Sequence, residues 1–339
     1  MGKQSSVDVT TLRQLLHLLD AAVHNKKADA TLFDAPSGTD WDTLLRLSRN
    51  NNVDALVCDA IQLLPDNLLP PRTLWLPCLA RQKQTEMAYK HLLKVQTELT
   101  NILRAHGIKA LVLKGTALAA LYPTPSHRLF DDIDLFTHHL QPEADAIIAR
   151  QYGIEIDNGR HRHSKFAIEG VTIENHYALV DNHKTASAAG YEQLLLKQLP
   201  SPTFEALFLL RHTAMHFATE RITLRHLCDW MLFVEHHTAD IDWKQLAHHL
   251  DKFGMSSFVG ALDTLLAQHL GFHLPSGLPT CNDGELLDRV LAEIVVSRHH
   301  DSRFHRLMSN RWKHRLCFCD PWLDTLLRTF IMHFKSNKR

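Results

Sequence analysis

Two aspartates stand one residue apart in a stretch that alternates acidic and apolar side chains. Asp132 and Asp134 lie between Phe130 and Phe136, and this alternation predicts a β-strand with one functional face. Side chains two positions apart on a strand share a face, so both carboxylates are expected to project together while Ile133 enters the core. Such carboxylates repel each other unless a cation lies between them. Because Mg²⁺ binds one or two carboxylates together with water and substrate phosphates, the spacing predicts the protein's share of a magnesium site.

A third acidic position lies on a later segment of similar character. Glu174 and His176 share one face of the strand predicted from Val171 to Tyr177. We expect Glu174 to complete the metal site or to act as a base for an attacking hydroxyl. Asp131 breaks the alternation, and we interpret it as a surface residue or the start of the strand. In the alternative register Asp131 is functional, and only one acid remains on the active face.

A phosphate-binding turn is predicted before these acids. Lys114, Gly115 and Thr116 follow a predicted strand and open a predicted helix, and the free N–H groups at a helix N-terminus suit phosphate. Gly115 allows the backbone to approach a ligand closely, and Thr116 adds a hydroxyl. Lys114 and Arg128 are the candidate cations for the phosphate chain. The spacing of a P-loop is absent.

Two histidines lie four residues apart on a later predicted helix. The spacing of His212 and His216 can bind zinc, but Thr213 occupies the glutamate position of the HExxH motif. We therefore expect both histidines to line or cap a cleft, with a phosphate or acceptor contact as the alternative. Arg225, His226 and Asp229 lie on the next predicted helix. A structural ion pair such as Arg225 with Asp229 is expected there, with a role near the nucleotide as the alternative.

The motifs follow one another in a set order. They are Leu113-Lys114-Gly115-Thr116-Ala117-Leu118-Ala119, Leu121-Tyr122-Pro123, Arg128, Asp132-Ile133-Asp134-Leu135 and Glu174-Asn175-His176. This order resembles the uncharacterised bacterial nucleotidyltransferase family, which belongs to the DNA polymerase β-like superfamily. The resemblance is specific over residues 108 to 180 and looser around residues 211 to 236. Thr116 replaces the Gly or Ser that usually follows the glycine of the superfamily motif, and it keeps a hydroxyl.

The resemblance implies transfer of a nucleotidyl group from an NTP donor to a hydroxyl-bearing acceptor, with release of pyrophosphate. Asp132 and Asp134 would hold Mg²⁺, with Mn²⁺ as an alternative, and Glu174 would be a third ligand or a base. Gly115 and Thr116 would bind the triphosphate. A small molecule, a sugar phosphate, a protein hydroxyl and an RNA end remain open as acceptors. The alternative hypotheses are a catalytically silent nucleotide-binding or scaffold protein of this fold, and a histidine-rich metal hydrolase suggested by His300-Asp301.

The periodicity of apolar residues predicts an α+β architecture in three regions. An N-terminal helical region (1–107) and a C-terminal helical region (183–339) flank a small α/β nucleotidyltransferase core (108–182). Helices are expected at 9–23, 40–63, 76–106, 115–121, 141–151, 204–217, 224–236, 243–253, 258–270, 285–296 and 321–334. Strands are expected at 108–113, 130–136, 166–168 and 171–177, with a hairpin turn at 169–170.

Composition limits the function classes. Lys plus Arg and Asp plus Glu both number 37, so net charge gives no general bias toward nucleic acid or an anionic membrane, although a local basic patch stays open. The six cysteines match no zinc pattern. The chain does not open on a basic segment followed by an apolar one, and its apolar runs are too short to span a bilayer. A cytoplasmic location without a membrane span is expected.

Overall fold

The computed structural model describes residues 8–34, 38–159, 162–180, 185–296 and 310–322. Within them helices dominate and four strands form one sheet, which confirms the α+β class. The N-terminal helices are α1 (Val9–Val23), α2 (Trp41–Asn50), α3 (Asp54–Ile61) and α4 (Arg72–Ala105). The middle of the chain holds β1 (Leu111–Val112), α5 (Thr116–Ala119), β2 (Asp132–Phe136), α6 (Gln141–Tyr152), β3 (His163–Ile168) and β4 (Val171–His176). The later helices are α7 (Ala186–Gln198), α8 (Pro202–Thr219), α9 (Leu224–His236), α10 (Trp243–Lys252), α11 (Ser256–His269), α12 (Gly284–Val296) and α14 (Arg311–Cys317).

The N-terminal helices differ from the prediction at one point. A single helix from Asp40 to Leu63 is wrong, because α2 ends at Asn50 and α3 begins at Asp54. Asn52 between them has a φ of 57°. This left-handed conformation is one that asparagine tolerates and that a continuous right-handed helix does not contain.

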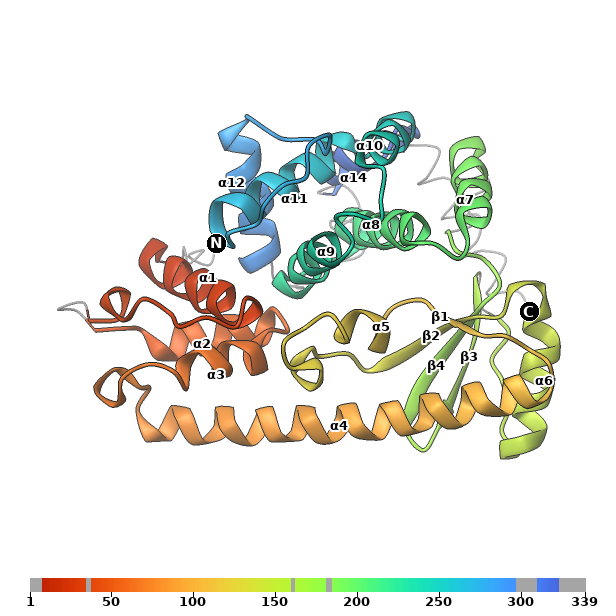
Figure 1. The fold of residues 1–339 in the computed structure, drawn as a ribbon, viewed down its shortest axis with the longest axis horizontal. Helices are drawn as coiled ribbons and strands as arrows, with labels where there is room; N and C mark the ends of the chain where they lie inside the picture. The colour runs from red at the N-terminus through yellow and green to blue at the C-terminus, as the bar shows by residue number, and fades with distance from the viewer. Residues whose placement is uncertain (1–7, 35–37, 160–161, 181–184, 297–309, 323–339) are drawn as a thin grey trace, which may run out of the picture.

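Helix α4 runs along one side of the molecule, beneath both the N-terminal helices and the sheet (Figure 1). The sequence predicts a helix from Leu76 to His106, whereas α4 begins at Arg72 and contains Pro77. A proline inside a helix lacks the N–H donor of the helical ladder. Leu74 and Trp75 pack against the helical core, and this packing stabilises the turn that precedes the proline.

The sheet has the strand order β1-β2-β4-β3. β2 pairs in parallel with β4, while β1 and β3 pair antiparallel with their neighbours. One face is apolar and packs against α4 and α6, through Ile133 and Leu135 of β2 and Ile173 of β4. The other face carries the polar residues, as the period-two pattern predicts.

Strand β1 is shorter than predicted. The aliphatic run from Ile108 to Leu113 predicts a strand buried on both faces, but only Leu111 and Val112 pair, and both are half-buried. β1 lies at the edge of the sheet and has β2 as its one partner there. An edge strand has one ladder of hydrogen bonds, so its length is set by the few residues that lie opposite that partner.

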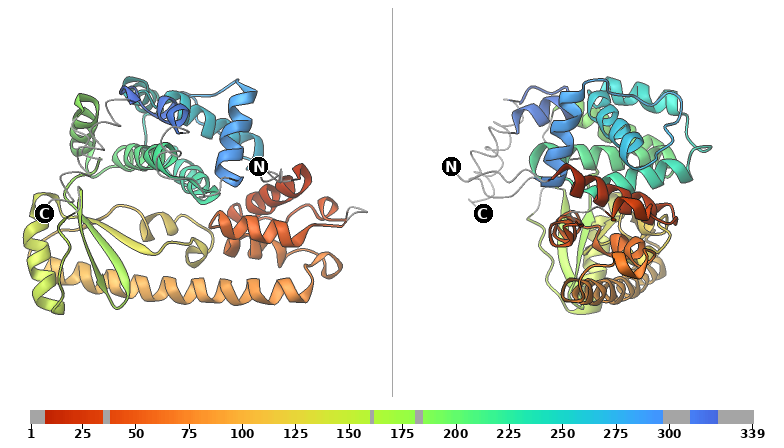
Figure 2. Two further views of the ribbon diagram at one scale, coloured as in Figure 1. Left: turned by 180° about the vertical axis from the view of Figure 1, so that it is seen from behind. Right: turned by 90° about the vertical axis from the view of Figure 1, so that its left-hand side faces the viewer.

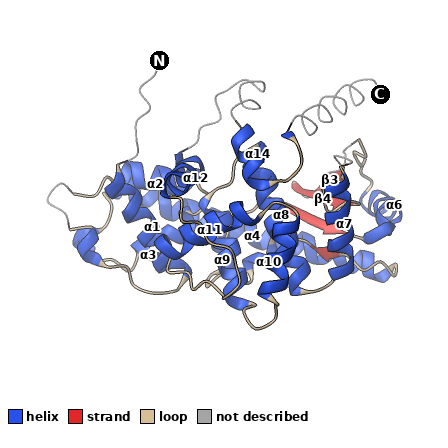
Figure 3. Ribbon diagram, turned by 90° about the horizontal axis from the view of Figure 1, so that it is seen from above, coloured by secondary structure: helices blue, strands red, loops and turns tan. Residues whose placement is uncertain are grey.

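The buried apolar side chains form two clusters. One contains side chains of α1–α3 together with side chains of α8–α12, so helices from both ends of the chain share a core. The other joins the sheet to α6 and to the second half of α4, which contributes Leu92, Val95, Leu99 and Leu103. The sheet lies at one end of a largely helical molecule (Figures 1, 2 and 3). In the view of Figure 1, α7 and α8 lie above the sheet and α4 lies below it. The predicted boundaries of the three regions stay predictions.

Two predicted features fall where the structure gives no description. The helix expected from Pro321 to Phe334, apart from its first two residues, and the pair His300-Asp301 lie outside the described residues. α7 and α14 lie in the C-terminal region predicted to be helical, although the prediction gives neither of them bounds of its own. In the described part of the chain, no helix combines the length and apolar character that crossing a membrane requires.

Candidate active site

Three carboxylates converge on the polar face of the sheet. Asp134 of β2 lies opposite Glu174 of β4 in the parallel register, and Asp132 lies two residues before Asp134. Their carboxylate oxygens all lie within 4.8 Å of one another. The predicted arrangement of Asp132 and Asp134 on one face, with Ile133 in the core, is therefore present. Parallel pairing adds Glu174 to it because neighbouring strands lie only about 4.8 Å apart.

Asp134 is held by two partners. It is nearly fully buried, and its Oδ2 accepts from Lys114 Nζ at 2.8 Å while its Oδ1 accepts from His176 Nε2 at 2.9 Å. Burial by itself would raise the pKa of Asp134, but the charge of Lys114 and the hydrogen bond from His176 outweigh it and lower that pKa. Asp134 is therefore an anion at neutral pH.

Asp132 is half-buried, and its pKa shifts in the direction opposite to that of Asp134. Burial, followed by the negative charge of Asp134, raises the pKa of Asp132. A divalent cation next to both carboxylates would remove this repulsion. Because carboxylate oxygens are the ligands that Mg²⁺ and Mn²⁺ prefer, the donor set of Asp132, Asp134 and Glu174 suits such an ion.

Glu174 is surrounded by basic side chains of the hairpin. Lys165 Nζ lies 3.3 Å and His163 Nε2 lies 3.5 Å from Glu174 Oε1, and His176 Nε2 lies 4.0 Å from Oε2. Sequence reasoning missed His163 and Lys165. They occupy alternate positions of β3 opposite His176 and Glu174, so the antiparallel register of the predicted hairpin is the signal that could have found them.

Lys114 connects the sheet to helix α8. Besides Asp134, its Nζ lies 3.2 Å from His212 Nε2. Burial, then the charge of Lys114, holds the pKa of His212 well below its ordinary value. His212 is thus neutral at neutral pH, and its Nε2 accepts a hydrogen bond from Lys114. The ring of His216 lies 4.4 Å from that of His212, and its Nδ1 contacts Glu220 Oε2 at 3.1 Å.

These groups border a cavity between the sheet and the helices. Its volume is about 380 Å³. Asp132, Asp134, Lys114, His212 and His216 line it, whereas Glu174 and His176, the third histidine considered for the cleft, lie outside its lining. Further lining residues come from three other segments, namely Asn50, Asn52, Arg221, Thr223, Arg225 and His226. The cavity therefore reaches from the carboxylates of the sheet to the helices of the opposite layer.

The turn before α5 has the backbone that its glycine predicts. Gly115 has φ 60° and ψ −112°, a combination that residues with a Cβ rarely adopt. A Cβ at this position would also lie 3.4 Å from the ring of Phe130. The hydroxyl of Thr116 donates to Gln96 Oε1 at 2.7 Å, so it anchors the turn to α4. Gly115 lines the cavity beside Lys114.

Arg128 has a different surrounding from the one predicted. Its guanidinium is buried and donates to both carboxylate oxygens of Asp229, at 2.6 and 2.8 Å, and to Gly115 O at 3.3 Å. Tyr122 OH donates to the same Asp229 at 2.6 Å. The expected pair of Arg225 with Asp229 is therefore replaced by Arg128 with Asp229. Arg128 positions the Gly115 turn, and its donors are engaged by protein groups.

Removing this buried cation should destabilise the fold. We expect Arg128→Gln to lower the free energy of unfolding by about 3 kcal/mol, because Asp229 would keep a buried charge without its guanidinium partner. Urea unfolding followed by circular dichroism measures the difference. The double variant Arg128→Gln with Asp229→Asn is the control, since it removes both charges and should recover part of the loss. An unchanged urea midpoint in Arg128→Gln would contradict a stabilising role of the buried Arg128–Asp229 ion pair.

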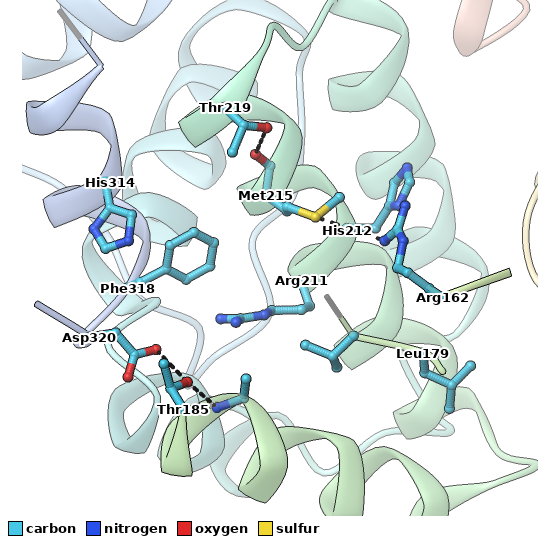
Figure 4. Close-up of a pocket in the computed structure, with 12 residues that line it drawn as sticks. Arg162, Leu179, Thr185, Arg211, His212, Met215, Thr219, His314, Phe318 and Asp320 are labelled. Atoms are coloured by element: carbon cyan, nitrogen blue, oxygen red, sulfur yellow. Dashed lines mark hydrogen bonds between the residues drawn. The ribbon is translucent and has the colours of Figure 1, made fainter. Parts of the chain in front are cut away.

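A second cavity lies beside α8 and shares His212 with the first. Its volume is about 40 Å³, and Arg211, Met215 and Phe318 are among the residues around it (Figure 4). The guanidinium of Arg211 lies 4.2 Å from the ring centroid of Phe318. This space is too small for a nucleotide, and Asp132, Asp134 and Glu174 do not line it. The larger cavity is therefore the candidate active site.

Comparison with known proteins identifies the family. A family model described as an uncharacterised nucleotidyltransferase matches residues 37–271. Neither a curated protein nor a solved structure matches the chain. The matched region exceeds half of the chain and includes every residue that lines the larger cavity, as well as Glu174. This chain belongs to the uncharacterised nucleotidyltransferase family.

Proposed function

We propose that the protein is a Mg²⁺-dependent nucleotidyltransferase that moves an NMP group from an NTP to a hydroxyl acceptor and releases pyrophosphate. The observation that carries this proposal is the convergence of three carboxylates, with one oxygen of each within 4.8 Å of the others. Two of them, Asp132 and Asp134, line the cavity together with Lys114 and Gly115. Membership of a nucleotidyltransferase family supports the reaction class. Mn²⁺ has the same preference for carboxylate oxygens and is the expected substitute.

The residues in and beside the cavity have different proposed roles. Asp132 and Asp134 would hold the metal ions, which supply charge neutralisation at the entering and leaving oxygens of the transferred phosphoryl group. We assign Glu174 as a third ligand rather than a base, because it lies outside the cavity lining and is surrounded by Lys165 and His163. The Gly115 turn would receive the triphosphate, since its backbone allows a close approach.

Lys114 is the counter-ion of Asp134 and would become a ligand of the substrate once a metal ion binds. Its ammonium group is engaged by Asp134 and His212, and it compensates the negative charge of the site in their neighbourhood. A metal ion on Asp134 would replace Lys114 as the counter-ion of that carboxylate. Lys114 would then be available to the triphosphate as a point charge on a flexible stem.

In the proposed reaction, the acceptor oxygen attacks the α-phosphorus of the NTP. The bond from that phosphorus to the oxygen bridging to the β-phosphate breaks, and pyrophosphate leaves with its electron pair. The acceptor hydroxyl releases its proton to water as its oxygen bonds to phosphorus. The chain's contribution is positioning and charge compensation, which are the main contributions to catalysis of phosphoryl transfer.

Nucleotide binding gives a direct test. Thermal unfolding would be measured with ATP, GTP, CTP and UTP, each with and without Mg²⁺, for the wild type and Asp132→Asn. A ligand at ~100 times its Kd stabilises the fold by about 2.7 kcal/mol, which corresponds to a Tm rise of about 4 °C for a chain of this length. We expect such a rise with at least one nucleotide, dependent on Mg²⁺ and lost in Asp132→Asn.

The matched control is Asp288→Asn. It makes the same chemical change at an exposed aspartate that lies outside the cavity lining and outside the cluster of three carboxylates. It should keep the Mg²⁺-dependent rise. Equal Tm rises in the wild type and Asp132→Asn would overturn the proposed site. A Tm rise with nucleotide that does not depend on Mg²⁺ would favour the catalytically silent nucleotide-binding alternative.

A further inference from the structure

Part of the cavity wall carries cations that the carboxylate site does not use. The connection from α8 to α9 and the first turn of α9 place Arg221, Arg225 and His226 along the cavity. Lys114 and Arg128, the other basic residues of the lining with permanent charge, are engaged by Asp134 and Asp229. The two arginines therefore decide what charge the cavity offers away from the sheet.

Arg225 lacks a carboxylate partner among the described residues. Its Nη1 donates to the backbone oxygen of Leu129 at 2.9 Å, and its buried Nε has no hydrogen-bond partner in the described part of the chain. Asp229 lies one helical turn further on, but its carboxylate is taken by Arg128 and Tyr122. A half-buried guanidinium without a counter-ion raises the free energy of the folded state, because its charge is partly removed from water. An anion bound in the cavity would offset this free-energy cost.

Arg221 shows the same pattern independently. Its Nη2 donates to the backbone oxygen of Ile294 at 3.1 Å and lies 3.4 Å from Asn51 Oδ1. Both partners are neutral, and within the described residues its buried Nε has no partner. These contacts hold the guanidinium of Arg221 in place without an ion pair in the part of the chain that the structure describes, although the charge of Glu293 also acts on it. A guanidinium fixed in this way is suited to bind an anion.

His226 adds a neutral donor next to these arginines. Its Nδ1 accepts a hydrogen bond from the backbone N–H of Thr223 at 3.1 Å. Burial, and then the charge of Arg225, holds the pKa of His226 well below its ordinary value, so the ring is neutral. A neutral imidazole whose Nδ1 accepts carries its proton on Nε2. The ring that lines the cavity therefore has an N–H donor besides the two guanidinium groups.

We propose that Arg221, Arg225 and His226 form an anion-binding subsite that receives a phosphate group of the acceptor. This assignment rests on the proposed nucleotidyl transfer. The donor triphosphate is expected beside the metal ions and the Gly115 turn, whereas the subsite is built from a different layer of the fold. The hydrogen bond from Arg225 to Leu129 keeps it near the carboxylates, since Leu129 precedes Asp132 by three residues. The favoured acceptor is thus a hydroxyl compound that also carries a phosphate.

Inorganic phosphate is the probe for the test. Its affinity would be measured by calorimetry without Mg²⁺ for the full-length wild type, Arg225→Gln and Arg221→Gln. We expect each substitution to weaken phosphate binding about tenfold to hundredfold, the loss typical of one hydrogen bond to a charged group. Arg104→Gln is the matched control, because Arg104 is an exposed arginine near the end of α4 and far from the cavity lining. Two separate arginines keep the test informative if one variant fails to fold.

Binding of the Mg²⁺ complex of the nucleotide separates the two sources of phosphate. Unchanged nucleotide affinity in Arg225→Gln, together with weakened phosphate binding, supports the acceptor subsite. Loss of both affinities in proportion would assign the subsite to the donor triphosphate and overturn the acceptor assignment. Equal phosphate binding in all variants, or none in the wild type, would overturn the subsite itself.

A failure of the proposed function would give a different experimental result from a failure of the subsite. Asp132→Asn should lose the Mg²⁺-dependent nucleotide response and keep its phosphate affinity, because the carboxylates lie outside the arginine subsite. If the wild type bound phosphate through Arg225 but bound no nucleotide with Mg²⁺, nucleotidyl transfer and the acceptor assignment would both be overturned while the anion site stood.

Discussion

Asp132→Asn is expected to lower nucleotidyl transfer at least about 10³-fold while the protein stays folded. The substitution removes a charged metal ligand that would stabilise charge at the reacting phosphoryl group, where such groups have their largest effects. Release of pyrophosphate from the nucleotide selected by thermal unfolding would be measured with a panel of hydroxyl acceptors that includes sugar phosphates. Asp288→Asn should retain activity within about threefold, because Asp288 is exposed and lies outside the cavity lining.

Asp134→Asn should lose activity to the same extent but differ in stability. Asp134 is the shared acceptor of Lys114 and His176, so its loss leaves two buried partners without their anion. We expect the free energy of unfolding to fall by about 2 kcal/mol in Asp134→Asn, and to change little in Asp132→Asn, where repulsion from Asp134 is removed. Full activity in either variant would overturn the metal-ligand assignment, and full activity in both would favour the hydrolase alternative.

The second large effect concerns stability and involves Asp263, which lies outside the cavity lining. Asp263 of α11 is fully buried, and its Oδ1 accepts from Trp230 Nε1 at 2.7 Å. Its Oδ2 has no partner among the described residues. Burial raises the pKa of Asp263 from 3.8 to about 8, despite the opposing hydrogen bond from Trp230. At neutral pH the folded protein therefore holds this carboxyl in its protonated form.

The sign of the pH dependence follows from this raised pKa. Between about pH 4 and pH 8 the folded state keeps a proton that the unfolded state releases, so the free energy of unfolding falls as pH rises. The contribution is fully present below about pH 4 and is lost as pH passes about 8. With about 1.4 kcal/mol for each pH unit, the whole change attributable to Asp263 is at most about 6 kcal/mol.

Asp263→Asn should abolish this dependence. The amide cannot ionise, and its oxygen can still accept from Trp230, so the variant is expected to be more stable than the wild type at pH 9 by about 3 kcal/mol or more. At pH 4 the advantage should disappear. Urea unfolding at pH 4, 6 and 9 measures both curves, with the exposed Asp288→Asn as the control. Parallel curves for Asp263→Asn and the wild type would show that Asp263 is ionised in the fold.

The local parts of the site could be predicted from the sequence. The alternation around Asp132 and Asp134 predicts which side chains share a face, because the pleat of a strand imposes a period of two on any chain that adopts it. The same reasoning holds for Glu174 and His176, and the helical period locates α1 and α9 at their observed bounds. The predicted length of β1 and the predicted single helix over α2 and α3 were wrong. The extent of strand pairing and the conformation of Asn52 depend on neighbouring segments of the fold.

The partners of the charged residues could not be predicted. Lys114 and His212 are 98 residues apart, and Arg128 and Asp229 are 101 apart. Sequence spacing suggested Arg225 as the partner of Asp229, because residues four apart on a helix can meet. Packing of α9 against the Gly115 turn brought Arg128 to Asp229 instead, and this left Arg225 facing the cavity.

The sequence by itself therefore determined the types of chemistry and the faces on which they lie: three acids, a glycine turn, and the helices that carry histidine and arginine. Backbone periodicity is a property of each segment alone, so no other part of the chain is needed to deduce it. Only the tertiary structure decided which acid is held ionised, which arginine is engaged and which is open to a ligand. Those outcomes depend on burial and on distances between segments remote in the chain, which exist only once the segments have packed.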